Sequence, residues 1–206
     1  RYSMPKKIGI FASGRGSNAE ALYQAMLDGT IDGDLKLILT DHKEAGIVDK
    51  ARTWGIPLLI IERVDYPSKE AFEEAQVQAL APYDLDVLVL AGYMRLLGQT
   101  LIDAYGGRIL NIHPALLPSF PGLHAQGQAV AAGVKVAGCT VHFVDLGMDS
   151  GPIIMQSTVP VYASDTEESL AVRLLPVEHK TYVEALALFC KDSLSVVDGI
   201  VHIANE

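Results

Sequence analysis

Cysteine is scarce in this chain, which has only Cys139 and Cys190 among 206 residues. The two lie far apart and form no C-x-x-C pair, so the sequence does not predict a structural zinc site. Sparse thiols of this kind are typical of a reducing compartment, and we therefore expect a cytoplasmic protein. We interpret both cysteines as small buried hydrophobic side chains.

Long apolar runs are also missing, although half of the residues are hydrophobic. No run reaches the ~18 residues that a membrane-spanning helix needs. The first residues, RYSMPKKIGIFAS, contain only a short apolar stretch, so we expect no signal peptide. The composition indicates one domain with a sizeable core and no membrane partner.

Positive charge is in deficit, with 16 Lys and Arg against 25 Asp and Glu and a net charge of −9. Nucleic-acid binding depends on a basic face, so this balance argues against a nucleic-acid partner. It does not exclude a small anionic ligand, because local dipoles and single side chains can bind one.

Short apolar strands alternate with helical patterns through the first half of the chain. The predicted strands are 7–12, 35–40, 57–61, 86–91 and one ending at Asn111, and the predicted helices are 19–29, 45–54, 68–80 and 101–105. This alternation is typical of a doubly wound, mostly parallel α/β sheet with helices on both faces.

The second half has a different pattern. A helix over 124–132 precedes two consecutive strands, 137–144 and 153–161, with no helix between them. Asp165 or Thr166 is expected to cap a long helix that reaches about Leu188, with a kink or break at Pro176. The end of the chain predicts a hairpin turning at Asp198-Gly199. We therefore expect a β-extended carboxyl-terminal half with a long helix.

A glycine-rich turn, SGRGSN, connects the first predicted strand to the first helix. Backbone N–H groups at a helix start favour an anion, and Ser17 and Asn18 follow Gly16 there with polar side chains. We interpret the turn as a cradle for a monophosphate. It lacks the Gly-Lys-Ser/Thr of a P-loop and matches a dinucleotide fingerprint only loosely, with Ala19 in place of the third glycine. A plain capped turn is the structural alternative.

The stretch ILNIHPALLPSFPG places Asn111 and His113 at the end of a buried strand. They are two residues apart, so their side chains point the same way on an extended strand. Pro114, Pro118 and Pro121 make the following loop stiff. An amide donor and a proton donor aimed together can stabilise an oxyanion. The alternative is an Asn turn beside a structural histidine.

Asp149 lies in a loop between Gly147 and Gly151, where it is either a turn residue or a functional acid. His142, inside the predicted strand TVHFV, is interpreted as a hydrogen-bonded structural histidine.

The motifs SGRGSN, AGYMRLL, NIHPALLPSFPGLH, GCTVHFV and D-x-x-x-D-S-G-P occur in this order. From about Lys6 to Leu188 the chain resembles the folate-dependent phosphoribosylglycinamide formyltransferase family. The resemblance implies transfer of the formyl group of 10-formyltetrahydrofolate to the amine of glycinamide ribonucleotide in purine synthesis. The amine attacks directly through a tetrahedral intermediate, and no metal is needed.

The resemblance also assigns residues to roles. The catalytic set is Asn111, His113 and Asp149; the ribonucleotide phosphate is bound by Gly16, Ser17 and Asn18, and its ribose by Glu178; the folate is bound by Lys69, Met94, Arg95, Leu96, Leu97, Asn111, Val144 and Asp145. A carboxylate favours the charged form of a neighbouring imidazole, so Asp149 is expected within hydrogen-bonding or one-water distance of His113.

Further expectations follow from the same resemblance. The peptide bond between Leu117 and Pro118 is expected to be cis. Residues 1–206 form one domain, with a phosphate-binding Rossmann-like half over about 6–105 and a catalytic, folate-binding half over about 106–206. Lys69 stands where relatives often carry Arg, and the sequence departs from some relatives over residues 125–128. A homodimer is left open.

Formyltetrahydrofolate deformylase, in which water replaces the amine, resembles this family but carries an amino-terminal regulatory domain. Few residues precede the first strand here, so we do not expect a deformylase. Methionyl-tRNA formyltransferase would need a basic RNA-binding domain. A non-catalytic phosphosugar-binding protein or a nucleotide oxidoreductase would leave Asn111, His113 and Asp149 without a role.

Overall fold

The computed structural model describes residues 4–206, which divide into two compact units. The first unit ends at Leu110, and the second runs from Asn111 to Glu206. Residues 1–3 lie outside the described residues. They begin the stretch RYSMPKKIGIFAS, in which we expect no signal peptide. Seven strands follow the order β3-β2-β1-β4-β5-β6-β7 in one mostly parallel sheet, which confirms the predicted fold class.

The first unit is a doubly wound α/β structure. Its strands are β1 (Lys6–Phe11), β2 (Gly33–Thr40), β3 (Leu58–Ile60) and β4 (Val87–Leu90). Its helices are α1 (Ser17–Leu27), α2 (Gly46–Trp54), α3 (Lys69–Leu80) and α4 (Gln99–Tyr105), with short 3-10 turns η1 (Arg63–Asp65) and η2 (Ala81–Tyr83). β1 pairs in parallel with both β2 and β4, and β2 pairs in parallel with β3.

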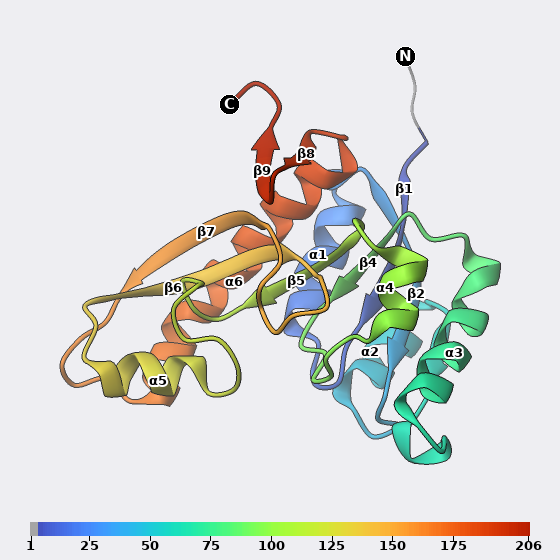
Figure 1. Ribbon diagram of the computed structural model, residues 1–206, viewed down its shortest axis with the longest axis horizontal. Helices are drawn as coiled ribbons and strands as arrows, with labels where there is room; N and C mark the ends of the chain where they lie inside the picture. Colours follow the sequence, from blue (N-terminus) through green and yellow to red (C-terminus); the bar gives the residue numbers. More distant parts are fainter. Residues whose placement is uncertain (1–3) are drawn as a thin grey trace. The chain divides into compact units, whose positions relative to one another are not determined.

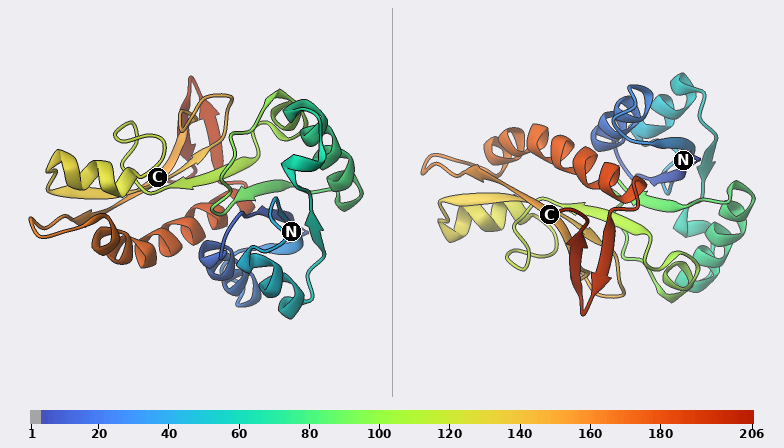
Figure 2. Two further views of the ribbon diagram at one scale, coloured as in Figure 1. Left: turned by 90° about the horizontal axis from the view of Figure 1, so that it is seen from below. Right: turned by 90° about the horizontal axis from the view of Figure 1, so that it is seen from above.

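Helices cover both faces of these strands, with α1 and α2 on one side and α3 and α4 on the other (Figure 2). The four residues of β4 are all buried, as expected for a parallel strand covered on both faces. Ser68, where the predicted helix over 68–80 begins, is the N-cap of α3, because its hydroxyl accepts a hydrogen bond from the N–H of Ala71 at 3.0 Å.

The second unit starts within β5 (Ile109–His113). It contains α5 (Ala125–Ala132), β6 (Val136–Phe143), β7 (Ile153–Pro160), α6 (Glu167–Cys190), β8 (Leu194–Val197) and β9 (Ile200–Ile203). β6 and β7 pair antiparallel, and α6 runs along them (Figure 1). Asp198 and Gly199 both have positive φ, which confirms the predicted hairpin turn.

Helix α6 corrects one prediction and decides another. It is continuous from Glu167 to Cys190, so a break at Pro176, one of the two predicted outcomes, is wrong, while a kink there stays a prediction. Pro176 removes the N–H that would bond to the carbonyl of Val172, but Val172 is 73% exposed and water can bond to that carbonyl. Thr166 is the cap, and its hydroxyl accepts from the N–H of Ser169 at 3.1 Å.

Cys139 and Cys190 are both buried, as predicted, and neither is in a disulfide within the described residues. No helix within residues 4–206 is long and apolar enough to cross a membrane.

Candidate active site

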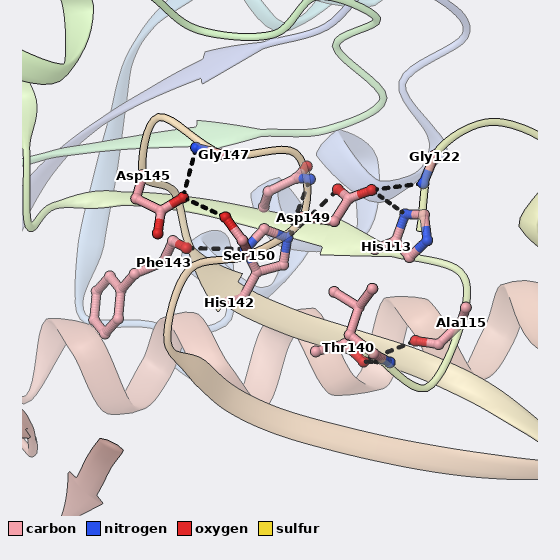
Figure 3. A network of polar contacts seen from close by, with 12 residues as sticks. His113, Ala115, Gly122, Thr140, His142, Phe143, Asp145, Gly147, Asp149 and Ser150 are labelled. Atoms are coloured by element: carbon pink, nitrogen blue, oxygen red, sulfur yellow. Dashed lines mark hydrogen bonds and ion pairs between the residues drawn. The ribbon is translucent and has the colours of Figure 1, made fainter. Parts of the chain in front are cut away.

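His113 ends β5 and is only 6% exposed. Its Nε2 lies 2.8 Å from the carbonyl oxygen of Phe120, so this nitrogen carries a proton and donates it. Its Nδ1 lies 3.5 Å from Oδ2 of Asp149 (Figure 3). The structure thus brings His113 and Asp149 together as expected, with Nδ1 as the nitrogen that faces the carboxylate.

Asp149 is held by the backbone. Its Oδ2 accepts the N–H of Gly122 at 2.9 Å, and its φ of 52° lies in the left-handed region, which Asp and Asn adopt more readily than most residues. Gly151 allows the loop to close, because a Cβ at that position would clash with the carbonyl oxygen of Phe143. The carboxylate is therefore fixed beside the imidazole.

Asp145 organises the same loop from within. Its Oδ1 accepts the N–H of Gly147 at 2.9 Å and the hydroxyl of Ser150 at 2.8 Å (Figure 3). Asp145 and its neighbour Val144 thus lie in the segment that carries Asp149.

His142 belongs to the same cluster, which the sequence did not reveal. Its Nε2 lies 3.5 Å from Nδ2 of Asn111 and 4.0 Å from Oδ1 of Asp149. Its Nδ1 donates to the carbonyl oxygen of Phe143 at 2.9 Å, so the interpretation of His142 as a hydrogen-bonded histidine is confirmed. Strand alternation alone could not place it here, because the β6–β7 register shifts between Val141 and His142.

Burial sets the charge of His142. The side chain is 3% exposed, and loss of hydration lowers the pKa of His142 below the usual value for histidine. The neutral ring with its proton on Nδ1 presents a lone pair on Nε2 toward the amide of Asn111. This arrangement orients the amide nitrogen, and the second amide hydrogen stays available to an oxyanion.

Thr140 fixes the loop that follows His113. Its hydroxyl donates to the carbonyl oxygen of Ala115 at 2.7 Å and accepts the N–H of Leu117 at 3.1 Å (Figure 3). Gln156 donates to the carbonyl oxygen of Leu117 at 2.9 Å. The Leu117-Pro118 peptide bond in this loop is cis, which confirms the prediction.

A cavity of about 390 Å³ lies in the first unit. Its lining includes all five first-unit residues to which the resemblance assigns folate binding, namely Lys69, Met94, Arg95, Leu96 and Leu97. The sequence missed four other lining residues, which are Arg63, Phe72, Glu73 and Tyr93. Tyr93 lies within the motif AGYMRLL, whereas nothing in the local pattern identifies Arg63, Phe72 and Glu73, which come from η1 and α3.

The glycine-rich turn enters α1 with Gly16 as its N-cap. Gly16 has φ of 75°, and a Cβ there would collide with the side chain of Ile47. No side chain accepts a capping hydrogen bond from the first backbone N–H groups of the helix. Ser17 and Asn18 form the first turn, and Oδ1 of Asn18 is buried without a hydrogen-bond partner among residues 4–206.

Glu178 lies on α6 in the second unit and is 8% exposed. Of the remaining acids on α6, Glu167 pairs with Nδ1 of His124 at 2.9 Å.

Comparisons with known proteins place this fold and these motifs. Residues 6–186 match the family model described as formyl transferase. The chain is 47% identical over 177 residues to the phosphoribosylglycinamide formyltransferase of Bacillus subtilis (strain 168), which covers 86% of this chain and 91% of that protein.

Two solved structures extend the comparison. Glycinamide ribonucleotide transformylase 1 from Symbiobacterium toebii has a TM-score of 0.97 and 44% identity over 99% of this chain and 96% of that chain. A formyltetrahydrofolate deformylase from Pseudomonas syringae pv. tomato has a TM-score of 0.89 and 28% identity over 97% of this chain but 66% of that chain.

The fold and the matched residues define the class as formyl transferases. The chain belongs to this family and, within it, to the phosphoribosylglycinamide formyltransferases. The resemblance carried by the motifs is thereby confirmed, as is the expectation of an enzyme of formyl transfer.

Proposed function

We propose that this chain transfers the formyl group of 10-formyltetrahydrofolate to the amine of glycinamide ribonucleotide in de novo purine synthesis. The observation that carries the proposal is the pair of a buried His113 and a partly buried Asp149, with Nδ1 of the imidazole 3.5 Å from the carboxylate. Asn111 completes the set, since it lies two residues before His113 on β5.

The amine is the nucleophile and attacks the formyl carbon directly, which gives a tetrahedral oxyanion. The amide of Asn111 donates to that oxygen without a change of charge. The N–H on Nε2 of His113 is committed to the carbonyl oxygen of Phe120, so Nδ1 is the nitrogen that gains and loses a proton. Protonated Nδ1 donates toward the intermediate and toward the departing N10 of the folate.

Asp149 stabilises the imidazolium electrostatically and accepts the amine proton, directly or through a water molecule. Its side chain is 13% exposed, so solvent screens this attraction only in part. The chemistry involves no covalent enzyme intermediate, because the substrate supplies its own nucleophile.

The ribonucleotide is bound through its phosphate and its ribose. The uncapped start of α1 at Gly16, Ser17 and Asn18 offers N–H donors and the positive end of the helix dipole to the phosphate. Glu178 accepts hydrogen bonds from the ribose hydroxyls.

The folate occupies the cavity of the first unit. The apolar parts of Met94, Leu96 and Leu97 contact the pterin, and the exposed ammonium of Lys69 attracts the glutamate carboxylates. Val144 and Asp145 also contact the folate. A chain with only two cysteines, Cys139 and Cys190, agrees with a cytoplasmic location.

Hydrolysis of 10-formyltetrahydrofolate is the competing function, because a deformylase structure shares this fold with a TM-score of 0.89. The test incubates the purified chain with 10-formyltetrahydrofolate, with and without glycinamide ribonucleotide, and follows the absorbance of the released folate. We expect release that depends on the ribonucleotide. Equal release in its absence, accompanied by formate, would establish the hydrolase instead.

A further inference from the structure

Asp41 lies directly after β2 and is almost fully buried, with its side chain 1% exposed. Its two oxygens have different partners. Oδ1 accepts the hydroxyl of Ser13 at 2.6 Å, and Oδ2 accepts Nε of Arg95 at 2.7 Å. Nε2 of His42, which is half exposed, lies 3.5 Å from Oδ2.

Asp41 and its two hydrogen-bond partners, Ser13 and Arg95, come from segments that follow three neighbouring parallel strands. Ser13 follows β1, Asp41 follows β2 and Arg95 follows β4, and β1 pairs with both of the others. The hydroxyl of Ser13 also accepts the N–H of Met94 at 3.0 Å. One buried carboxylate therefore fixes both the side chain of Arg95 and, through Ser13, the backbone at Met94.

Both Met94 and Arg95 line the 390 Å³ cavity of the first unit. Asp41 engages Arg95 only through Nε, and the guanidinium carbon lies 5.4 Å from the ring centre of Phe72. Within residues 4–206 neither Nη atom donates a hydrogen bond. The carboxylate of Asp41 and the ring of Phe72 thus hold the side chain of Arg95 in place, and its terminal N–H groups are available to a ligand.

We propose that Asp41 is the positioning residue of this cavity, and that it sets the affinity for the reduced folate by orienting Arg95 and Met94. The inference rests on the proposed function, because it takes a reduced folate as the occupant. Asp41 does not contact the reacting atoms, so it acts on folate binding and leaves ribonucleotide binding and turnover nearly unchanged.

Asp41→Asn is the most informative variant because it is nearly isosteric. Asn offers one acceptor oxygen where Asp offers two, and its NH₂ group would face a donor, either Ser13 or Arg95. It also removes the negative charge that pairs with the partly exposed guanidinium of Arg95. We expect a rise of about tenfold in KM for 10-formyltetrahydrofolate. KM for glycinamide ribonucleotide should stay within twofold and kcat within threefold.

Asp34→Asn is the matched control, since it removes one carboxylate from β2 at an exposed position outside the cavity. A double-mutant cycle with Arg95→Gln provides the specific readout. Once Arg95 has lost its charge, Asp41→Asn should add less than threefold to the folate KM. A folate KM within twofold of wild type in Asp41→Asn, or effects of the two changes that simply multiply, would overturn the inference.

Ser13→Ala keeps the carboxylate of Asp41 and tests the same inference if Asp41→Asn does not fold. It should raise the folate KM about threefold by releasing the N–H of Met94, and an unchanged folate KM would overturn the inference.

Binding of unformylated tetrahydrofolate, measured by calorimetry, distinguishes a failure of the proposed function from a failure of the inference alone. A wild-type chain that does not bind it overturns the proposed function together with the inference. Binding that is equal in wild type and Asp41→Asn overturns the inference alone.

Discussion

Replacing Asp149 by Asn perturbs the proposed chemistry with little change of shape. Asp149 has a φ of 52°, and Asn adopts this left-handed conformation readily, so the backbone of the loop is preserved. The Oδ atom of Asn can still accept the N–H of Gly122, which lies 2.9 Å from the carboxylate in the wild type. The variant therefore removes the charge and little else.

The magnitude follows from the distance of 3.5 Å between the carboxylate and Nδ1 of His113. Opposite charges about 4 Å apart attract by about 4 kcal/mol at an effective dielectric constant of about 20. The transition state carries an imidazolium, so loss of most of this attraction slows turnover by about 10² to 10³-fold. This range agrees with the usual contribution of general acid–base groups, about 10² to 10⁴-fold.

Steady-state kinetics with both substrates varied provides the assay. Asp149→Asn should lower kcat by about 10²-fold or more, while KM for the ribonucleotide changes far less, because its phosphate is bound elsewhere. Asp198→Asn is the control, since Asp198 also has a left-handed φ, of 51°, but lies in the exposed β8–β9 turn. Near wild-type turnover in Asp149→Asn would refute the assignment of this carboxylate.

Three further predictions concern binding and stability. Ser17→Asp should raise KM for the ribonucleotide at least about tenfold without destabilising α1, because an acid at a helix start favours the helix but repels a phosphate; an unchanged KM would contradict the phosphate site. Lys69→Gln should raise KM for the folate about two- to fivefold, as expected for an exposed charge pair worth up to about 1 kcal/mol. An unchanged folate KM would contradict the proposed contact of Lys69 with the glutamate carboxylates. Burial lowers the pKa of His142, so the unfolded chain binds a proton at this group more readily than the folded chain does. The free energy of unfolding should therefore fall as the pH drops below about 6.5, and His142 contributes at most about 1.4 kcal/mol per pH unit to this fall. Denaturant unfolding at several pH values should show a weaker fall in His142→Gln, and an identical pH dependence would contradict a neutral buried His142.

Much of the fold was predictable because local signals agreed with the global structure. The strands of the first unit are short apolar runs bounded by turns, and Ser68, Gly55 and the Asp198-Gly199 pair mark element ends by their own conformational preferences. The helix does not break at Pro176, because the cost of a missing N–H depends on whether solvent reaches the carbonyl that is left unbonded. That depends on the exposure of Val172, which sequence alone does not give.

The candidate site was predictable where a residue is defined by its place on a strand or in a motif. Asn111 and His113 share the end of β5, and Met94 to Leu97 follow β4 as one segment. His142 was missed as a member of the cluster because a register shift, rather than strand alternation, aims it. Asp41 was missed because its partners Ser13 and Arg95 are brought to it only by the parallel pairing of β1 with β2 and β4.

The fate of an isotopically labelled formyl group tests the central claim most directly. The purified chain would be supplied with labelled 10-formyltetrahydrofolate and excess glycinamide ribonucleotide, and the products would be separated and analysed by mass spectrometry. Direct attack by the amine predicts that the label appears in formylglycinamide ribonucleotide, in equal amount to the tetrahydrofolate released. Label recovered as formate, with the ribonucleotide unchanged, would contradict the account.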